Sequence, residues 1–363
     1  MDLIQIIHTI MLLFLAIGAV DYLLDGRLGL KEDFEEGIMT SGRLILCMAG
    51  FMVLAPVLAR VLGVIASPLC HLAGIDPSVL AGMFLANDAG GAALALELAD
   101  SREAGLYNGL IVGSMLGTTV MLGIPGLMIF TGKEERPSVI YGLLCGLATI
   151  PAGCLVGGTV AGFTAELIIR NTIPVFFVSA AILLALWFLG DRIISIFDKL
   201  GKLMTAVALL GLLCGAVESF FHITLIPGQG KLEEAFPVIG NISVFLAGAF
   251  PMIAVIRKVF SDALGHAARL FHTERIGISA LILSLANSLA AIMLLRDMDD
   301  QGRLVNVAFL TSAGCMLGDH LAFTSQVAPE MCAAVTAGKL AGGIAALCVA
   351  RLAISRIPGY RDK

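Results

Sequence analysis

The stretch FLANDAGGAA, residues 84–93, places a carboxylate and two adjacent glycines inside an otherwise apolar run. Asn87 and Asp88 are followed closely by Gly90 and Gly91. Glycine lets a backbone turn and approach a ligand, so the membrane segment is predicted to break here. The carbonyl and amide groups freed by a break need partners, which a polar ligand or an ion could supply. We therefore expect Asn87, Asp88 and Gly90 to contribute to a binding site; the alternative is that Asp88 caps a restarting helix.

The composition identifies the class of protein. Of the 363 residues, 58% are apolar and 14% are charged, whereas an average soluble domain has about 25% charged residues. Several runs exceed the roughly 18 to 20 apolar residues that cross a bilayer, and they are continuous rather than alternating. The sequence therefore predicts an all-α polytopic membrane protein and excludes a β-barrel. The run 3–24 lacks the basic start and cleavage site of a signal peptide.

The chain repeats itself at an interval of roughly 200 residues. AIGAVDYLL (16–24) is matched by LCGAVESFF (213–221), FLAN (84–87) by SLAN (284–287), and GSMLG (113–117) by GCMLG (314–318). These short matches follow one order along the chain, which chance does not explain. We expect about nine to eleven membrane segments in two homologous halves, 1–165 and 198–363. A linker, 166–197, adds one transmembrane helix between them.

Loop charges bear on the orientation of the two halves, because Lys and Arg favour cytoplasmic loops. If every segment crosses, the basic loop residues divide almost evenly. If 77–99 and 275–295 enter and leave on the same side, nearly all of these residues share one face. The exceptions are then Arg60, Arg102, Arg170 and Lys231. This arrangement makes the halves inverted repeats with re-entrant or broken helices, a common transporter plan. Taking 138–163 and 331–354 as the re-entrant pair gives a weaker bias and stays open.

Asn287 and Ser288 occupy in the second half the positions that Asn87 and Asp88 occupy in the first. In an inverted arrangement their tip meets the first tip from the opposite face of the membrane, so both residues are candidates for the site. The alternative is Asn and Ser packing between helices. The second tip has no carboxylate, so any recognition of charge is expected to be asymmetric.

Asp319 and His320, in GCMLGDHLAFTS (314–325), lie deep in another apolar run. Ionisable residues there are expensive and are functional candidates by default. The pair could relay protons or hold a cation, or it could be a buried pair that fixes helix packing. Thr118 is the first-half equivalent of Asp319. Lys339 either snorkels to the membrane interface or pairs with Asp319.

Motifs for other functions are absent from the sequence. The eight cysteines include no C-x-x-C pair, and no histidine stands at ligand spacing from another His or Cys, so we predict no metal site and no cofactor. H-E-x-x-H, P-loop and G-x-S-x-G motifs are missing, which leaves hydrolysis and ATP-driven pumping without support. No basic cluster suggests nucleic acid, and the net charge is −5.

Four stretches carry a resemblance to a known family. They are DGRLGLKEDFEEGI (25–38), LILCMAGFMVLAP (44–56), FLANDAGGAALALELA (84–99) and TSAGCMLGDHLAFTS (311–325). In this order, and over essentially the whole chain, the sequence resembles the EutH-type ethanolamine transporters. The resemblance implies a multi-pass protein of the bacterial inner membrane that imports ethanolamine, with this substrate and the lipid bilayer as its partners. A homo-oligomer such as a dimer is left open.

Ethanolamine is mostly a small cation at neutral pH, so its site needs a carboxylate, carbonyl oxygens or an aromatic face. It also needs a partner for the hydroxyl group. Asp88 beside Asn87 supplies both, whereas one Trp and four Tyr make an aromatic cage less favoured. We expect an alternating-access carrier of the protonated form. An ion-coupled carrier of another small polar solute and a non-transporting sensor or scaffold remain alternatives, and the residues do not decide between uniport and ion coupling.

Overall fold

The computed structural model describes residues 3–132, 134–189, 191–259 and 275–355. Within these ranges it is built from helices and contains no strand. Seven helical stretches of the described chain are long and apolar enough to cross a membrane, from Gln5–Leu23 to Pro329–Ile354. The protein is therefore a multi-pass α-helical membrane protein, which confirms the prediction from composition. Residues 260–274 and 356–363 of the expected second half lie outside the described residues.

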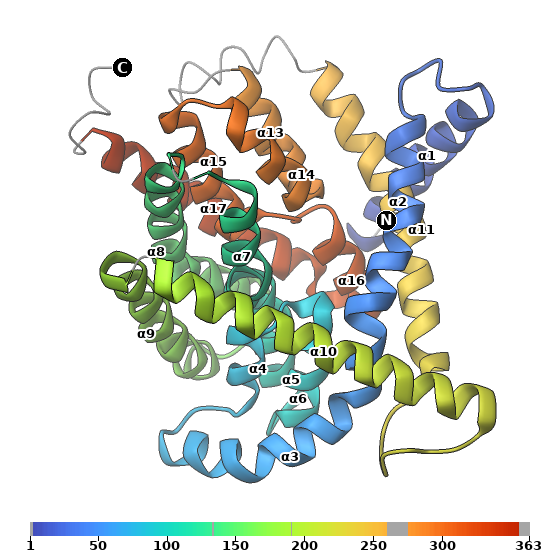
Figure 1. The fold of residues 1–363 in the computed structure, drawn as a ribbon, viewed down its shortest axis with the longest axis vertical. Helices are drawn as coiled ribbons and strands as arrows, with labels where there is room; N and C mark the ends of the chain where they lie inside the picture. The colour runs from blue at the N-terminus through green and yellow to red at the C-terminus, as the bar shows by residue number, and fades with distance from the viewer. Residues whose placement is uncertain (1–2, 133, 190, 260–274, 356–363) are drawn as a thin grey trace.

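Long helices alternate with short, broken ones along the chain (Figure 1). Up to residue 160 the elements are α1 (Leu3–Leu23), α2 (Lys31–Leu44), η1 (Ile45–Ala49), α3 (Gly50–Leu72), α4 (Ser78–Phe84), η2 (Asn87–Gly91), α5 (Ala92–Leu98), α6 (Arg102–Leu106), η3 (Tyr107–Gly117), η4 (Thr119–Gly123), α7 (Ile124–Phe130) and α8 (Arg136–Val160). From residue 165 they are α9 (Ala165–Leu189), α10 (Asp191–Phe221), α11 (Leu232–Val259), α13 (Arg275–Ala286), α14 (Ser288–Met293), η5 (Leu294–Asp297), α15 (Asp300–Ala313), α16 (Asp319–Val327), η6 (Pro329–Met331) and α17 (Cys332–Ile354). The elements η1 to η4 are π-helical, and η5 and η6 are 3₁₀ turns.

The segment 77–99 is a hairpin whose two ends meet. α4 and α5 pack against each other. The backbone N–H of Asp100, just after α5, donates a hydrogen bond of 3.1 Å to the carboxylate of Asp76, just before α4. The segment therefore enters and leaves on the same side of the molecule, as the re-entrant interpretation predicts. In Figure 1, α4 and α5 lie in the lower half of the molecule.

α13 and α14 form a second broken pair, in the upper half of Figure 1. The helix is interrupted at Asn287, whose backbone is extended. The side-chain oxygen of Asn287 accepts a hydrogen bond of 3.1 Å from the N–H of Ala290 and so caps α14. α13 contacts both α14 and the following turn η5, because the chain folds back along α13. The two hairpins thus approach the centre from opposite ends of the molecule.

Glycine allows each hairpin tip to contact the broken helix that follows it. A Cβ on Gly117 would lie 2.0 Å from the carbonyl oxygen of Leu85, and a Cβ on Gly318 would lie 1.9 Å from that of Ala286. Neither position accommodates a side chain without a shift of the backbone. Both glycines close the matched motifs GSMLG and GCMLG. The repeated sequence therefore corresponds to a repeated contact.

α8 and α17 cross each other through small residues. A Cβ on Gly153 would lie 2.7 Å from the carbonyl oxygen of Gly338, and a Cβ on Gly338 would lie 2.8 Å from that of Gly153. Small residues let two membrane helices approach until their backbones touch. The crossing places the next residue, Lys339, deep inside the protein, where 1% of its surface is exposed.

Contacts of basic residues fit the uneven distribution of charge between the two ends. Arg170 donates a hydrogen bond of 2.6 Å to the carbonyl of Gly74, just before the first hairpin. Arg102 begins α6, just after that hairpin. The membrane-spanning stretch Arg102–Leu127 starts with α6, and Phe130 lies just after its other end. Arg296 donates a hydrogen bond of 2.7 Å to the carbonyl of Phe130. Arg102 and Arg170 therefore lie at the end opposite Arg296, as predicted for these three.

Candidate substrate site

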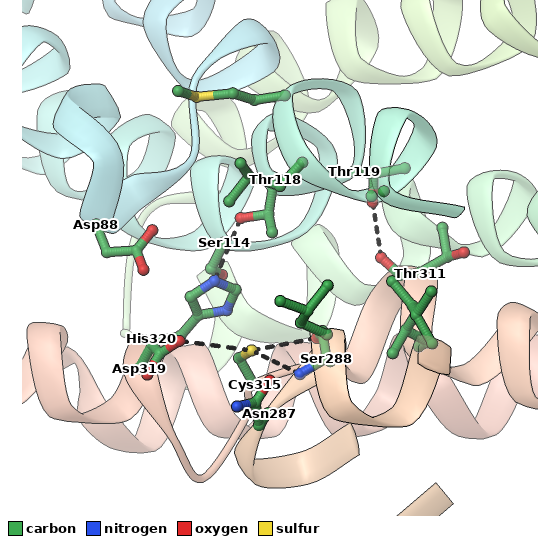
Figure 2. A pocket seen from close by; sticks show the side chains of 18 of the residues that line it. Asp88, Ser114, Thr118, Thr119, Asn287, Ser288, Thr311, Cys315, Asp319 and His320 are labelled. Carbon is green, nitrogen blue, oxygen red and sulfur yellow. Dashed lines mark hydrogen bonds between the residues drawn. The ribbon is translucent and has the colours of Figure 1, made fainter. Parts of the chain in front are cut away.

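A cavity of about 450 Å³ lies where the two hairpin tips, the break between α15 and α16, and α17 come together. Its polar or ionisable lining residues are Thr40, Arg43, Asp88, Ser114, Thr118, Thr119, Asn287, Ser288, Thr311, Cys315, Asp319, His320 and Lys339. Most of the remaining lining is apolar, which is typical of a pocket that holds a small molecule with a few placed polar groups. Figure 2 shows groups from the two halves of the chain facing each other across this space.

Asp88 reaches the cavity because the backbone leaves helical geometry directly after it. Ala89 and Gly90 have non-helical backbone angles, with φ of +95° at Gly90. Asp88 is 8% exposed, and its Oδ1 atom has no hydrogen-bond partner in the described chain. No side chain caps the helix that restarts at Ala92. The alternative role of Asp88, as the cap of this helix, therefore finds no support in the geometry.

Asn87 and Gly90 do not line the cavity, although the sequence places them beside Asp88. The Asn87 side chain is fully buried against Gly113, and neither of its amide atoms has a hydrogen-bond partner in the described residues. Gly90 packs against Phe51, and a Cβ there would lie 2.4 Å from that side chain. Gly90 thus provides the positive φ and the close packing that turn the tip, and Asp88 alone of the three faces the cavity.

The second tip and the break between α15 and α16 form one connected polar group. Both the N–H and the hydroxyl of Ser288 hydrogen bond to the sulfur of Cys315, at 3.4 and 3.1 Å. That thiol donates in turn to the carboxylate of Asp319, at 3.9 Å. Asn287, which caps α14, adds its side-chain amide to the same wall. The structure therefore brings together Asn287, Ser288 and Asp319, three of the residues that the sequence offers as site candidates.

Two hydrogen bonds join the halves of the chain across the cavity. His320 Nε2 and the hydroxyl of Thr118 share a hydrogen bond of 3.3 Å, so the residues that closely follow the matched motifs GSMLG and GCMLG contact each other. Thr119 donates from its hydroxyl to the carbonyl of Thr311 at 2.9 Å. These contacts lie on either side of the space seen in Figure 2. His320 is 2% exposed, and its Nδ1 atom has no partner in the described chain.

Lys339 and several hydroxyl groups of the cavity were not singled out as site residues from the sequence. The Lys339 ammonium donates to the backbone carbonyl of Ser114 inside the protein and does not reach the membrane interface. The signal that could have drawn attention to Ser114 and Thr118 is the repeated motif GSMLG, which contains the first and precedes the second. For Lys339 the glycine pattern of α17 was the available clue.

The charges of the cavity are arranged to favour a small cation. The carboxylates of Asp88 and Asp319 interact with each other electrostatically, and Lys339 interacts with Asp88. Arg43 also lines the cavity, but its guanidinium already pairs with Glu36. The cavity lining thus holds two carboxyl groups and one ammonium that is not paired with a carboxylate, so the carboxyl groups can bind a small cation. Serine and threonine hydroxyls on the same walls can bind a polar group of that cation.

Three buried polar atoms of cavity-lining residues have no hydrogen-bond partner in the described chain: Asp88 Oδ1, Asp319 Oδ1 and His320 Nδ1. Buried polar atoms are nearly always hydrogen-bonded, so a polar ligand or ordered water can bind to them. The fold and the cavity thus define a multi-pass membrane protein with an internal polar site framed by broken helices, an arrangement typical of secondary transporters.

The chain belongs to the EutH family. Residues 3–353 match the family model described as "Ethanolamine utilisation protein, EutH". A Listeria monocytogenes protein named "Probable ethanolamine permease EutH" is 42% identical over 96% of this chain and 94% of its own length. A Salmonella typhimurium protein of the same name is 35% identical, over 97% and 96%. "Uncharacterized protein YxeR" of Bacillus subtilis is 41% identical, over 93% and 91%. No solved structure matches the chain closely enough to be counted as a relative.

Proposed function

We propose that this protein is a permease, not an enzyme, that imports protonated ethanolamine across the inner membrane of a bacterium. Two of the relatives above carry the name of a probable ethanolamine permease, which supports the substrate. The observation that carries the proposal is the free carboxylate oxygen of Asp88. Asp88 lies on a buried hairpin tip and lines a cavity whose other wall contains Asp319 and His320.

In the proposed bound state, the substrate ammonium lies between Asp88 and Asp319. Charge-assisted hydrogen bonds of this kind are about twice as strong as neutral ones. The hydroxyl of ethanolamine then binds to polar groups of the cavity lining, where Thr118 and Ser288 provide donors and acceptors. The cavity is much larger than ethanolamine, so water fills the remainder. Asn87 and Gly90 support the tip behind Asp88 and do not contact the substrate.

We propose that the cycle moves the two hairpins relative to the rest of the protein in alternating access. In this proposal the two halves, 1–165 and 198–363, are inverted repeats joined by the linker 166–197. The approach of the hairpins from opposite ends supports this interpretation (Figure 1). So does the hydrogen bond between Thr118 and His320, which joins the segments that follow the matched motifs GSMLG and GCMLG. A site bounded by one hairpin from each side can be opened to either side in turn.

Uptake of labelled ethanolamine by proteoliposomes tests the proposal. The external medium is acidic, because neutral ethanolamine crosses lipid without a carrier. Asp88→Asn keeps the shape of the side chain and removes a charged hydrogen bond of about 1.5–3 kcal/mol, so apparent affinity should fall roughly 10- to 150-fold. Glu97→Gln is the matched control, because Glu97 is a carboxylate of the same hairpin that does not line the cavity.

Different results would support other functions. Undiminished uptake by Asp88→Asn at normal protein level would remove Asp88 from the site. Uptake is also measured in the presence of each member of a panel of small polar solutes. A competitor that abolishes ethanolamine uptake at a low concentration would identify the protein as a carrier of that other solute. Wild-type protein that is folded but moves no labelled ethanolamine would favour a membrane sensor or scaffold.

A further inference from the structure

Lys339 is a buried cation that the proposed binding of ethanolamine does not use. It lies on α17 beside the crossing with α8, and only 1% of its surface is exposed. A lysine within a membrane helix is costly unless its ammonium has partners. An ionisable residue at such a position is therefore a candidate for a function that needs its charge. Lys339 lines the same cavity as the carboxyl groups of Asp88 and Asp319, which indicates what that function is.

The ammonium of Lys339 is held by a backbone carbonyl and not by a carboxylate. It donates to the carbonyl oxygen of Ser114, in the π-helical element η3. In an α-helix the N–H of Thr118 would bond to this carbonyl. Here the same N–H bonds to the carbonyls of Gly113 and Met115 instead. A carbonyl oxygen has two lone pairs, and the oxygen of Ser114 uses one of them to accept from the ammonium of Lys339.

The ionisable groups that interact electrostatically with Lys339 come from four elements. They are Asp88 of the first tip, Cys315 of the break before α16, His320 of α16 and Cys154 of α8. Of these, Asp88 is the carboxylate. No ion pair between Lys339 and Asp88 is formed in the described chain, and Asp88 Oδ1 stays without a partner. Lys339 thus acts on the charge of Asp88 at a distance and leaves its oxygen free for a ligand.

We propose that Lys339 is a built-in counter-ion for Asp88, which lets the empty carrier return across the membrane without any inorganic cation. Transport is then uniport of the substrate cation. Without Lys339 the carboxylate of Asp88 would have no unpaired cation in the empty cavity, because Arg43, which also lines it, is already paired with Glu36. The loaded cavity would be less affected, because the substrate brings its own charge. The proposal rests on the proposed function, since it assumes that Asp88 receives a cation.

Two assays on the purified full-length protein in proteoliposomes separate the empty and the loaded carrier. Net uptake into vesicles without internal ethanolamine requires the empty carrier to return. Exchange against saturating internal ethanolamine requires movement of the loaded carrier alone. Both are measured at the same acidic pH on the two sides, with N-methylglucamine as the only buffer cation. Wild-type protein should show both activities, and replacing N-methylglucamine by sodium or potassium should change neither.

Lys339→Met should lose net uptake by about tenfold or more, equivalent to 1.4 kcal/mol, while exchange is retained. Added sodium should partly restore its net uptake. Lys339→Arg keeps the charge and should keep net uptake in N-methylglucamine. The proposal is overturned if wild-type net uptake needs sodium, potassium or a proton gradient, a measurement that requires no variant. It is equally overturned if Lys339→Met loses exchange and net uptake in parallel while folded, because that marks a structural role. Wild-type protein without either activity contradicts the proposed function itself.

Discussion

Adding one methyl group at Gly117 should displace the tip that carries Asp88. In the structure the new Cβ would lie 2.0 Å from the carbonyl oxygen of Leu85, whereas real Cβ contacts stay at or above about 3.0 Å. The tip or the helix therefore has to move by roughly 1 Å, and overpacking of this kind destabilises a protein by about 1–3 kcal/mol. Because Asp88 follows Leu85 closely, Gly117→Ala should also weaken ethanolamine binding.

The matched control for this prediction is Gly123→Ala. Gly123 lies in the next turns of the same helix, and its Cβ would make only ordinary contacts, the nearest at 3.6 Å. Thermal unfolding in detergent reports stability, and the concentration dependence of uptake reports affinity. Gly117→Ala should lower both, whereas Gly123→Ala, at a residue that lines the cavity, serves as the control for stability and should leave the unfolding temperature unchanged. If the two variants unfold at the same temperature and bind ethanolamine equally, the close approach of tip and helix is not a feature of the protein.

Two further predictions concern the cavity walls. A small cationic thiol reagent should block uptake by modifying Cys315, and saturating ethanolamine should slow this block. The variant Cys315→Ala should resist the reagent, whereas the control Cys348→Ala should stay sensitive. Resistance of the wild-type protein would place Cys315 outside the cavity. Thr118→Val loses the bond to His320, which should weaken apparent affinity about fivefold, or about 1 kcal/mol, in uptake assays. Thr159→Val is the control, since Thr159 is exposed and bonds only within its own helix; an equal effect of the two would argue against the contact with His320.

Much of the architecture could be predicted from the chain because membrane insertion imposes simple rules. Long apolar runs must be helical, and a carboxylate next to two glycines must interrupt such a run or lie at a special position. The stretch 84–93 obeys both rules, and the hydrogen bond between Asp76 and Asp100 shows the return of the chain that the loop charges predict. The break at Asn287 was found only through its likeness to the first tip.

The candidate site could be predicted only in part. Charged and amide residues stand out in an apolar sequence, so Asp88, Asn287, Asp319 and His320 were found. Serine and threonine do not stand out, because their hydroxyls can bond to the preceding turn of their own helix. Whether Thr118 faces lipid, a neighbouring helix or the cavity depends on the rotation of η3, which π-helical geometry shifts away from the usual period.

The sequence by itself determined that this protein is a helical membrane protein with two broken elements. Long apolar runs indicate the membrane helices, and the likeness of the two halves indicates the second break, and both can be seen without knowledge of tertiary contacts. Only the tertiary structure decided which of the neighbours Asn87, Asp88 and Gly90 faces the cavity. The backbone leaves helical geometry at Ala89 and Gly90, so that Asp88 lines the cavity while Asn87 and Gly90 pack inside the protein. It also decided the place of Lys339. A lysine can extend to the membrane surface or turn inward, and the glycine crossing of α8 and α17 together with the carbonyl of Ser114 directs this one to the centre.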